Sequence, residues 1–263
     1  MTSLGGDQII PRPPGSVPGG PAPWASLDPQ RRRGLSIERV VAALELHTDS
    51  GDRAPASATT DAAPGAGAAA APVSVLPDLL LEGERIPSAV LVAMFEQSGE
   101  TRVILTRRSK ALRLHQGEVS FPGGRCDRGE SPTECALREA HEETGLDPST
   151  VSVVGCLSPL TTFSSQSFVT PVVGVLGGRP RLQANPGEVD RVFDVELAEL
   201  ASDGTFREER WRLADRPGST ERPAATETGG PEGWYPVWFF ELPGDTVWGA
   251  TARILVELLE AVL

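Results

Sequence analysis

The sequence has few cysteines and no long apolar run. Its three cysteines, Cys126, Cys135 and Cys156, are an odd number without CxxC spacing, which excludes a disulfide framework and a thiolate zinc site. We therefore expect a reducing, cytoplasmic location. No apolar run approaches the ~18 residues needed to span a bilayer, and the chain does not start with a basic stretch followed by an apolar one. We expect neither a membrane span nor an export signal.

Basic residues are also scarce relative to acidic ones. There are 24 basic and 36 acidic residues, which gives a formal net charge of −12. A negative chain opposes broad contact with the phosphates of nucleic acids or anionic lipids, so we expect neither as a partner. Glycine and proline, with 28 and 24 residues, remain below the share typical of low-complexity chains, so a packed core can form.

The first 74 residues differ in composition from the rest of the chain. Residues 1–34 are rich in glycine and proline, and we expect a disordered lead-in. Residues 35–49 carry apolar residues at helical spacing after Ser36, a suitable N-cap, which predicts a helix. Residues 50–74 are mostly alanine, glycine and proline without any aromatic residue, which predicts a linker. The folded domain is expected over 75–263.

This domain has the pattern of a mixed α/β fold. A short polar turn separates two apolar runs at 88–96 and 101–107, which predicts a hairpin. The final segment has apolar residues at helical spacing, whereas residues 203–232 are polar and predict an exposed excursion. Further strands are expected at 151–157, 168–176, 188–195 and 237–241, and the final helix at 250–263.

A helix over 132–144 is bounded by specific residues at both ends. Ser131 as N-cap, Pro132 at the first helical position and Glu134 three residues after the cap form a capping box. At the other end Gly145 suits a left-handed cap, and Pro148 prevents continuation.

This helix carries an unusual acidic face. Glu139, Glu142 and Glu143 fall within one arc of its surface, where like charges repel at these spacings. One reading is a solvated acidic face. The other is a site for Mg²⁺ or Mn²⁺, which prefer oxygen ligands and bridge to substrate phosphates. Gly124 would let a backbone carbonyl approach the ion, and Glu130 could support the cluster.

A family resemblance favours the metal site. Gly124, Glu130, Arg138 and the run that follows it resemble the Nudix box, GX5EX7REUXEEXGU, with Ala140 as the small aliphatic residue. The resemblance implies an α/β/α sandwich with a mixed sheet, preceded here by a flexible extension. It also implies an enzyme that hydrolyses nucleoside diphosphates linked to another moiety.

A second motif precedes the box and resembles the signature of the coenzyme A pyrophosphatase branch. It comprises residues 104–109, Arg113, Gly117 and residues 121–124, with Ile104 where the signature has leucine. This resemblance implies metal-dependent hydrolysis of coenzyme A (CoA) or acyl-CoA to 3′,5′-ADP and 4′-phosphopantetheine or its acyl form. Arginine suits phosphate oxygens. The substrate contacts expected are Arg108 and Arg113 first, then Arg107 and Phe121.

The same resemblances assign roles around the acidic helix. The implied metal ligands are Glu139, Glu142, Glu143 and the Gly124 carbonyl, and Arg138 would hold a glutamate by ion pairing. The general base is left open between Glu142, Glu143 and Glu188. Two other functions stay open: a Nudix pyrophosphatase for another dinucleotide, such as ADP-ribose or NADH, and a catalytically silent nucleotide-binding module. The sequence also leaves homodimer formation open.

Overall fold

The computed structural model describes residues 4–50, 85–112, 116–162, 167–212 and 234–263. All but the first residue of the predicted linker over 50–74 lies outside these ranges, as does most of the expected excursion. Among the residues described, no helix combines the length and apolarity needed to cross a membrane.

The centre of the molecule is a mixed sheet whose main strands were expected from the sequence. β3 (Ile86–Gln97) and β4 (Glu100–Arg108) form the predicted antiparallel hairpin, turning through Ser98 and Gly99, both with positive φ. β9 (Ser167–Leu176) runs parallel to β3 on its other side. β10 (Val189–Glu196) lies beside β4 at one edge of the sheet, and β7 (Val151–Cys156) lies beside β9 at the other. Three short strands extend this order: β5 (Val119–Ser120) pairs with β4, β6 (Gly123–Arg125) with β3, and β8 (Leu160–Thr161) with β9.

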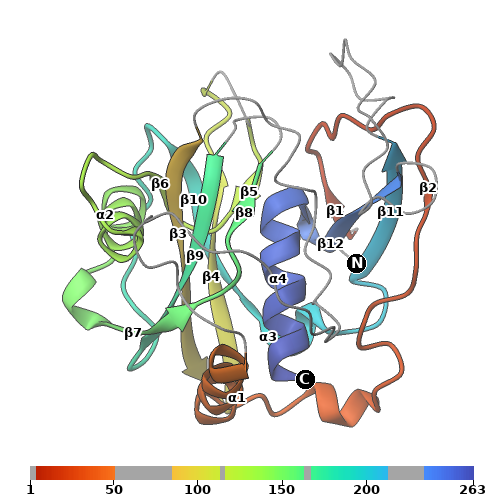
Figure 1. Cartoon of the computed structure of the whole chain (residues 1–263), viewed down its shortest axis with the longest axis horizontal. Coiled ribbons are helices and arrows are strands. Elements are labelled where there is room, and N and C mark those ends of the chain that lie inside the picture. The colour runs from red at the N-terminus through yellow and green to blue at the C-terminus, as the bar shows by residue number, and fades with distance from the viewer. Residues whose placement is uncertain (1–3, 51–84, 113–115, 163–166, 213–233) are drawn as a thin grey trace, which may run out of the picture.

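Helices cover both faces of this sheet. α2 (Pro132–Thr144) packs on one face, against alternate β3 residues such as Leu91 and Phe95. The intervening residues, such as Val92 and Met94, face α4 (Gly249–Val262), which with α1 (Ile37–Ser50) covers the other side (Figure 1). The α/β/α sandwich expected from the sequence is therefore present. Three short helical turns complete the described helices: η1 (Pro29–Arg32), η3 (Pro148–Thr150) and α3 (Leu197–Leu200).

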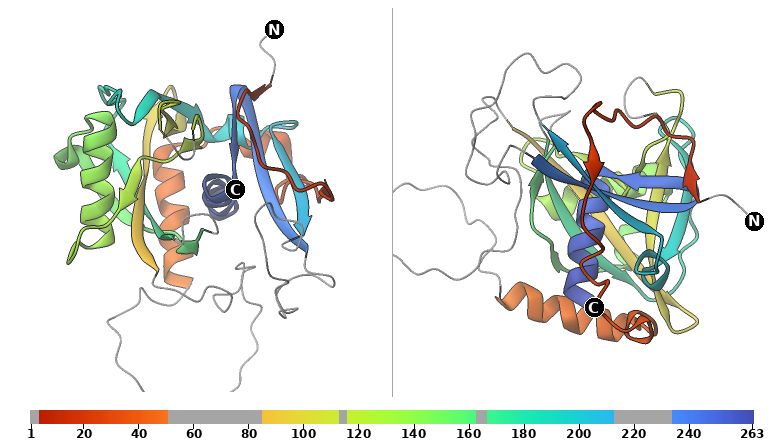
Figure 2. Two further views of the ribbon diagram at one scale, coloured as in Figure 1. Left: turned by 90° about the horizontal axis from the view of Figure 1, so that it is seen from above. Right: turned by 90° about the vertical axis from the view of Figure 1, so that its right-hand side faces the viewer.

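A second sheet adds a fourth layer outside α4, as the view from above shows (Figure 2). Its strands follow the order β1 (Gly5–Gly6), β12 (Trp234–Trp248), β11 (Phe206–Arg212) and β2 (Val17–Pro18). The excursion predicted over 203–232 is wrong for its first part, because residues 206–212 pair with β12. Charged side chains on both faces of β11 hide the apolar alternation by which a strand is recognised in a sequence.

The lead-in predicted over 1–34 also differs from expectation where it is described. β1 pairs with β12, β2 pairs with β11, and Trp24 is 3% exposed. Trp24 stacks at 6.2 Å from Phe240 and donates a hydrogen bond from Nε1 to the Ala201 carbonyl. The segment is ordered because its partners come from the far end of the chain, which its own composition does not reveal.

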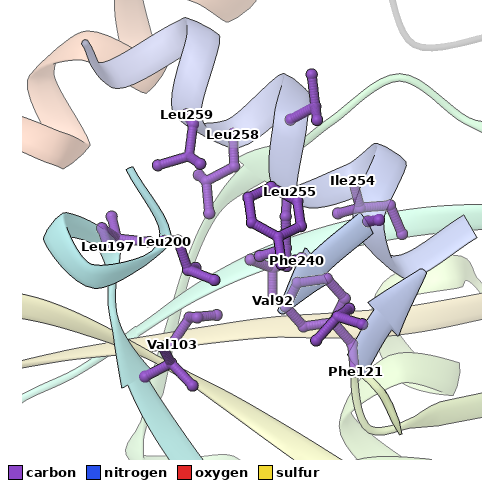
Figure 3. Packing of buried hydrophobic residues seen from close by; sticks show 14 of the residues in the cluster. Val92, Val103, Phe121, Leu197, Leu200, Phe240, Ile254, Leu255, Leu258 and Leu259 are labelled. Atoms are coloured by element: carbon purple, nitrogen blue, oxygen red, sulfur yellow. The ribbon is translucent and has the colours of Figure 1, made fainter. Parts of the chain in front are cut away.

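The larger core lies between the main sheet, α4 and the second sheet (Figure 3). Phe240 from β12 and Leu255 from α4 meet Val92 and Val103 from the main sheet there. This core fixes the end of β4, and with it the surface on which the predicted site lies.

Candidate functional site

α2 begins and ends at the predicted residues. Ser131 Oγ accepts a hydrogen bond from the Glu134 backbone N–H at 3.3 Å, and Glu134 Oε2 accepts one from the Ser131 N–H at 2.9 Å. Gly145 closes the helix with φ +67°, in the left-handed region. This capping fixes the rotation of α2, so the helix directs its carboxylates toward β6.

Glu143 is buried at the junction of α2 and β6. Its side chain is 3% exposed, and Oε2 accepts a hydrogen bond from the Gly123 backbone N–H at 3.2 Å. Burial raises the pKa of Glu143 to about 7, and the charges of Glu139 and Glu188 also raise it. The Gly123 N–H and Arg108 oppose this rise without cancelling it.

Glu139 lies directly against the glycine pair of β6. A Cβ at Gly124 would be 2.5 Å from Glu139 Cδ, so only glycine leaves room for this carboxylate. At Gly123 a Cβ would be 2.4 Å from the Ala89 carbonyl oxygen of β3. Burial raises the pKa of Glu139, and the charges of Glu142 and Glu188 add to the effect.

Arg138 connects the acidic residues along one side of the helix. Its guanidinium pairs with Glu130 Oε1 at 2.9 Å, with Glu139 Oε1 at 2.9 Å and with Glu142 Oε2 at 3.3 Å. The Arg138 hydrogen bond, together with the Asp127 backbone N–H, lowers the pKa of Glu130 to about 2. Arg138 therefore fixes the positions of these carboxylates but leaves Glu143 to other partners.

The acidic side chains around α2 lie close together, but their oxygen atoms do not yet form a complete coordination site. Among the described residues, no three acidic, cysteine or histidine side chains already form a group that could hold an ion. The side chains do not converge because Glu142 is turned toward Arg138, with its side chain 53% exposed. Glu143 is instead turned inward to Gly123.

The residues nevertheless fit a hard divalent cation. The donor set consists of oxygen atoms only, and the bare glycine backbone at Gly124 leaves space that a Cβ would fill. Among the described residues, the buried Glu143 carboxylate has one cationic neighbour, Arg108, whose Nη1 lies 3.7 Å from Glu143 Oε1. Two further carboxylates, Glu139 and Glu188, raise its pKa, so a cation would relieve a real excess of negative charge.

Arg108 and Arg107 project to opposite faces of β4, as consecutive strand residues do. Arg108 faces α2 and approaches Glu143, and its buried Nε has no hydrogen-bond partner among the described residues. Arg107 faces the second sheet, where it pairs with Asp245 and Asp7. The two arginines therefore do not meet in one pocket.

The other predicted substrate residues have different outcomes. Phe121 is 1% exposed within the larger hydrophobic core, so its side chain points away from the acidic cluster, and its contact with substrate stays a prediction. It follows β5 and packs inward, because the sheet face behind it is apolar. Arg113 lies outside the described residues. Glu188 precedes β10, and its charge acts on both Glu139 and Glu143, so the structure brings it to the acidic cluster.

Sequence reasoning missed one group of charged residues. Asp245 of β12 is 1% exposed and pairs with Arg107 and Arg191, while Asp7 pairs with Arg107 and Lys110. No local sequence signal identifies this group, since its members come from β4, the turn after β4, β10, β12 and the amino-terminal segment. It depends on the contact between the two sheets.

The α/β/α sandwich and its capped acidic helix beside a glycine pair define a Nudix-type fold. In agreement with this, the family model of the NUDIX domain matches residues 85–216, half of the chain. The chain belongs to the Nudix family.

The chain is similar to several named proteins. It is 38% identical over 181 residues to "Nudix hydrolase 15, mitochondrial" of Arabidopsis thaliana, covering 65% of this chain and 56% of that protein. It is 36% identical over 174 residues to "Uncharacterized Nudix hydrolase NudL" of Escherichia coli, covering 65% of this chain and 80% of that protein. The solved Nudix hydrolase RenU of M. smegmatis is 22% identical with a TM-score of 0.39, covering 44% of this chain and 74% of that one. The chain thus spans about half the length of the Arabidopsis relative.

Proposed function

We propose that this protein hydrolyses the diphosphate bond of CoA or acyl-CoA to 3′,5′-ADP and 4′-phosphopantetheine or its acyl form. The observation that carries the proposal is the contact between its two motifs. Arg108, the arginine of the upstream signature, lies 3.7 Å from Glu143 of the Nudix box. A phosphate-binding cation therefore adjoins the acidic cluster, as cleavage of a diphosphate requires.

We propose that Glu139, Glu142, Glu143 and the Gly124 carbonyl hold Mg²⁺ or Mn²⁺. When bound, the ion supplies charge neutralisation at the diphosphate and activates water. Arg138 acts as a positioning residue, because it pairs with Glu130, Glu139 and Glu142 and limits their rotation. Arg108 binds a diphosphate oxygen through its guanidinium.

We propose Glu188 as the proton acceptor for the attacking water. Its charge raises the pKa of both Glu139 and Glu143, which supports a position near the cluster, although it belongs to the loop before β10. Glu139 and Glu142 already bond Arg138, and Glu143 bonds Gly123, so Glu188 is the acidic neighbour outside the box. The cytoplasmic location stays a prediction.

Product analysis tests the reaction and the substrate together. Pure protein is incubated with CoA, ADP-ribose or NADH, with Mg²⁺ or Mn²⁺, in ¹⁸O-water, and products are identified by mass spectrometry. We expect 3′,5′-ADP and 4′-phosphopantetheine from CoA, with the label showing which phosphorus is attacked. Faster cleavage of ADP-ribose or NADH would indicate the other dinucleotide activity. CoA binding without any cleavage would indicate a silent module.

Substitutions test the assigned roles. Glu139→Gln keeps the shape that bonds Arg138 but removes a charge, so kcat/KM should fall at least about a hundredfold, on the order of 2.7 kcal/mol. Glu188→Gln should lower kcat at saturating metal by at least about tenfold. Glu38→Gln, at an exposed position in the first turn of α1, is the control and should have no effect. Full activity in either site variant would remove that residue from the proposed site.

A further inference from the structure

A second charged cluster lies at the end of β4, on the face opposite Glu143. Arg107 of β4 and Arg191 of β10 are directly paired in the sheet register, and both reach Asp245 of β12. Arg107 Nη1 lies 3.2 Å from Asp245 Oδ1, and Arg191 bonds Asp245 Oδ2. Asp245 is 1% exposed, so its two arginines hold a buried carboxylate where the two sheets meet.

The amino-terminal segment places one more carboxylate on this cluster. Asp7 Oδ2 lies 2.8 Å from Lys110 Nζ, and Asp7 Oδ1 bonds Arg107 Nη2. The preceding residues Gly5 and Gly6 pair with Pro243 and Gly244 of β12, and this short pairing delivers Asp7 to the cations. These two cations lower the pKa of Asp7 to about 2, so it is charged at neutral pH.

Asp7 does not satisfy the cluster completely. Among the residues that the structure describes, three cations, Arg107, Lys110 and Arg191, form ion pairs there with two carboxylates, Asp7 and Asp245. Among the described residues, the buried Nε of Arg107 has no acceptor, and neither does the buried Nε2 of Gln8 beside Asp7. Buried donors without acceptors are costly, and a ligand oxygen beside Arg107 would supply the acceptor that its Nε lacks. Asp190 also lies nearby, where it accepts a hydrogen bond from the Lys110 backbone N–H.

A ligand anion can replace the Asp7 carboxylate in its ion pairs. The side chains of Asp7 and Lys110 are 63% and 60% exposed, and exposed ion pairs contribute little free energy. A phosphate monoester carries up to two negative charges and three acceptor oxygens, more than one carboxylate offers. Gly117 of the upstream motif also borders the site, since a Cβ there would lie 3.6 Å from Arg107 Nη2 and 3.7 Å from Lys110 Cε.

We propose that Arg107, Lys110 and Arg191 form a binding site for a phosphate monoester, which Asp7 occupies in the free protein. Within the proposed function, on which this assignment rests, the phosphate is the 3′-phosphate of CoA, and free inorganic phosphate is the other source of the same chemistry. The amino-terminal segment then competes with the substrate for part of its binding site.

Equilibrium binding to the full chain without metal tests the proposal, because no hydrolysis is needed. Calorimetry compares CoA, dephospho-CoA and inorganic phosphate for the wild-type protein, Asp7→Asn and Lys110→Gln. Asp7→Asn should lower the Kd for CoA about three- to tenfold, and Lys110→Gln should raise it at least about threefold, with little change for dephospho-CoA. Asp203→Asn is the matched control, because Asp203 is also an exposed carboxylate paired with an arginine, and should change neither Kd.

The binding results distinguish a failure of the phosphate-site proposal from a failure of the proposed hydrolysis of CoA. A preference for CoA over dephospho-CoA that depends on Asp7 and Lys110 supports the site, even if no CoA is cleaved. Binding of inorganic phosphate with the same dependence, and no such preference, supports the site with free phosphate as its source. If neither variant changes the binding of CoA or of phosphate, the proposal is overturned, even if CoA is cleaved.

Discussion

Glu143 is a carboxylate in an environment that disfavours its charge. Its side chain is 3% exposed, and its surroundings offer one backbone N–H and a guanidinium 3.7 Å away. The raised pKa follows from burial first and from the neighbouring carboxylates Glu139 and Glu188 second. An uncharged residue at this position would avoid that cost, so the proposed role of Glu143 as a metal ligand would explain a carboxylate that stability alone does not favour.

The raised pKa of Glu143 predicts how stability depends on pH without metal. The folded protein keeps the Glu143 proton up to about pH 7, whereas the unfolded chain loses it near the ordinary value of 4.5. Stability is therefore greatest below pH 4.5 for this group, and falls as pH rises toward 7, by up to about 3 kcal/mol. We expect Glu143→Gln to remove this slope.

Urea denaturation in a chelating buffer, at several pH values between 4.5 and 8, measures this effect as the difference between the wild-type protein and Glu143→Gln. Added Mg²⁺ should restore stability to the wild-type protein at pH 8, because a cation that binds the folded state stabilises it. Parallel pH profiles for the two proteins would contradict the assigned environment of Glu143.

At the residue scale, the sequence predicts which glutamates gather on α2, but it does not predict the sheet face to which neighbouring side chains point. Glu139, Glu143 and Gly124 follow from spacing on a capped helix and a glycine pair. Arg107 and Phe121 could not be placed, because a one-residue difference in strand register determines which face a side chain occupies. Asp245 could not be identified from the sequence, since its partners Arg107 and Arg191 lie 138 and 54 residues away along the chain.

At the scale of elements, α2 shows how local chemistry fixes a boundary. Ser131 and Glu134 satisfy each other's backbone N–H groups, and Gly145 ends the helix in the left-handed region, so the predicted bounds are confirmed. β11 and β12 behave differently. Their pairing joins Phe206 to Phe240, and the buried residues of β12 pack in the core that α4 shares, a tertiary contact that sequence propensity does not measure.

The capping box gives a prediction at this scale. Ser131→Ala removes the hydroxyl that accepts the Glu134 N–H, and should lower the free energy of unfolding by about 1 kcal/mol. Because α2 carries Glu139 and Glu143, fraying of its first turn should also weaken metal binding slightly. Chemical denaturation and metal titration measure the two effects, and Ser131→Asp should restore the cap. An unchanged free energy of unfolding in Ser131→Ala would mean that the cap contributes nothing.

At the scale of the whole molecule, the two ends of the chain build one layer together. β1 and β2 from the amino-terminal segment flank β12 and β11, and Arg32, 5% exposed, donates to the carbonyls of Ala25, Leu27 and Ala201. Composition alone predicts a disordered lead-in over 1–34, because it measures how much apolar surface the segment could bury against itself. The segment instead supplies one large residue, Trp24, to a core that other segments build.

Trp24 therefore tests whether this outer layer is part of the folded unit. The ring lies 5.4 Å from Phe206 and 6.2 Å from Phe240, and its Nε1 donates to the Ala201 carbonyl at 3.1 Å. Trp24→Ala should lower the free energy of unfolding by about 3–5 kcal/mol, and Trp24→Phe, which keeps a ring but loses the donor, by less. Denaturation followed by circular dichroism gives both values. A loss below about 0.5 kcal/mol in Trp24→Ala, the range of surface substitutions, would mean that the amino-terminal segment is attached to the fold without stabilising it. A large loss would mean that the segment delivering Asp7 to Arg107 is held by the core rather than by the Asp7 ion pairs, so that Asp7 can be displaced while the rest of the segment stays in place.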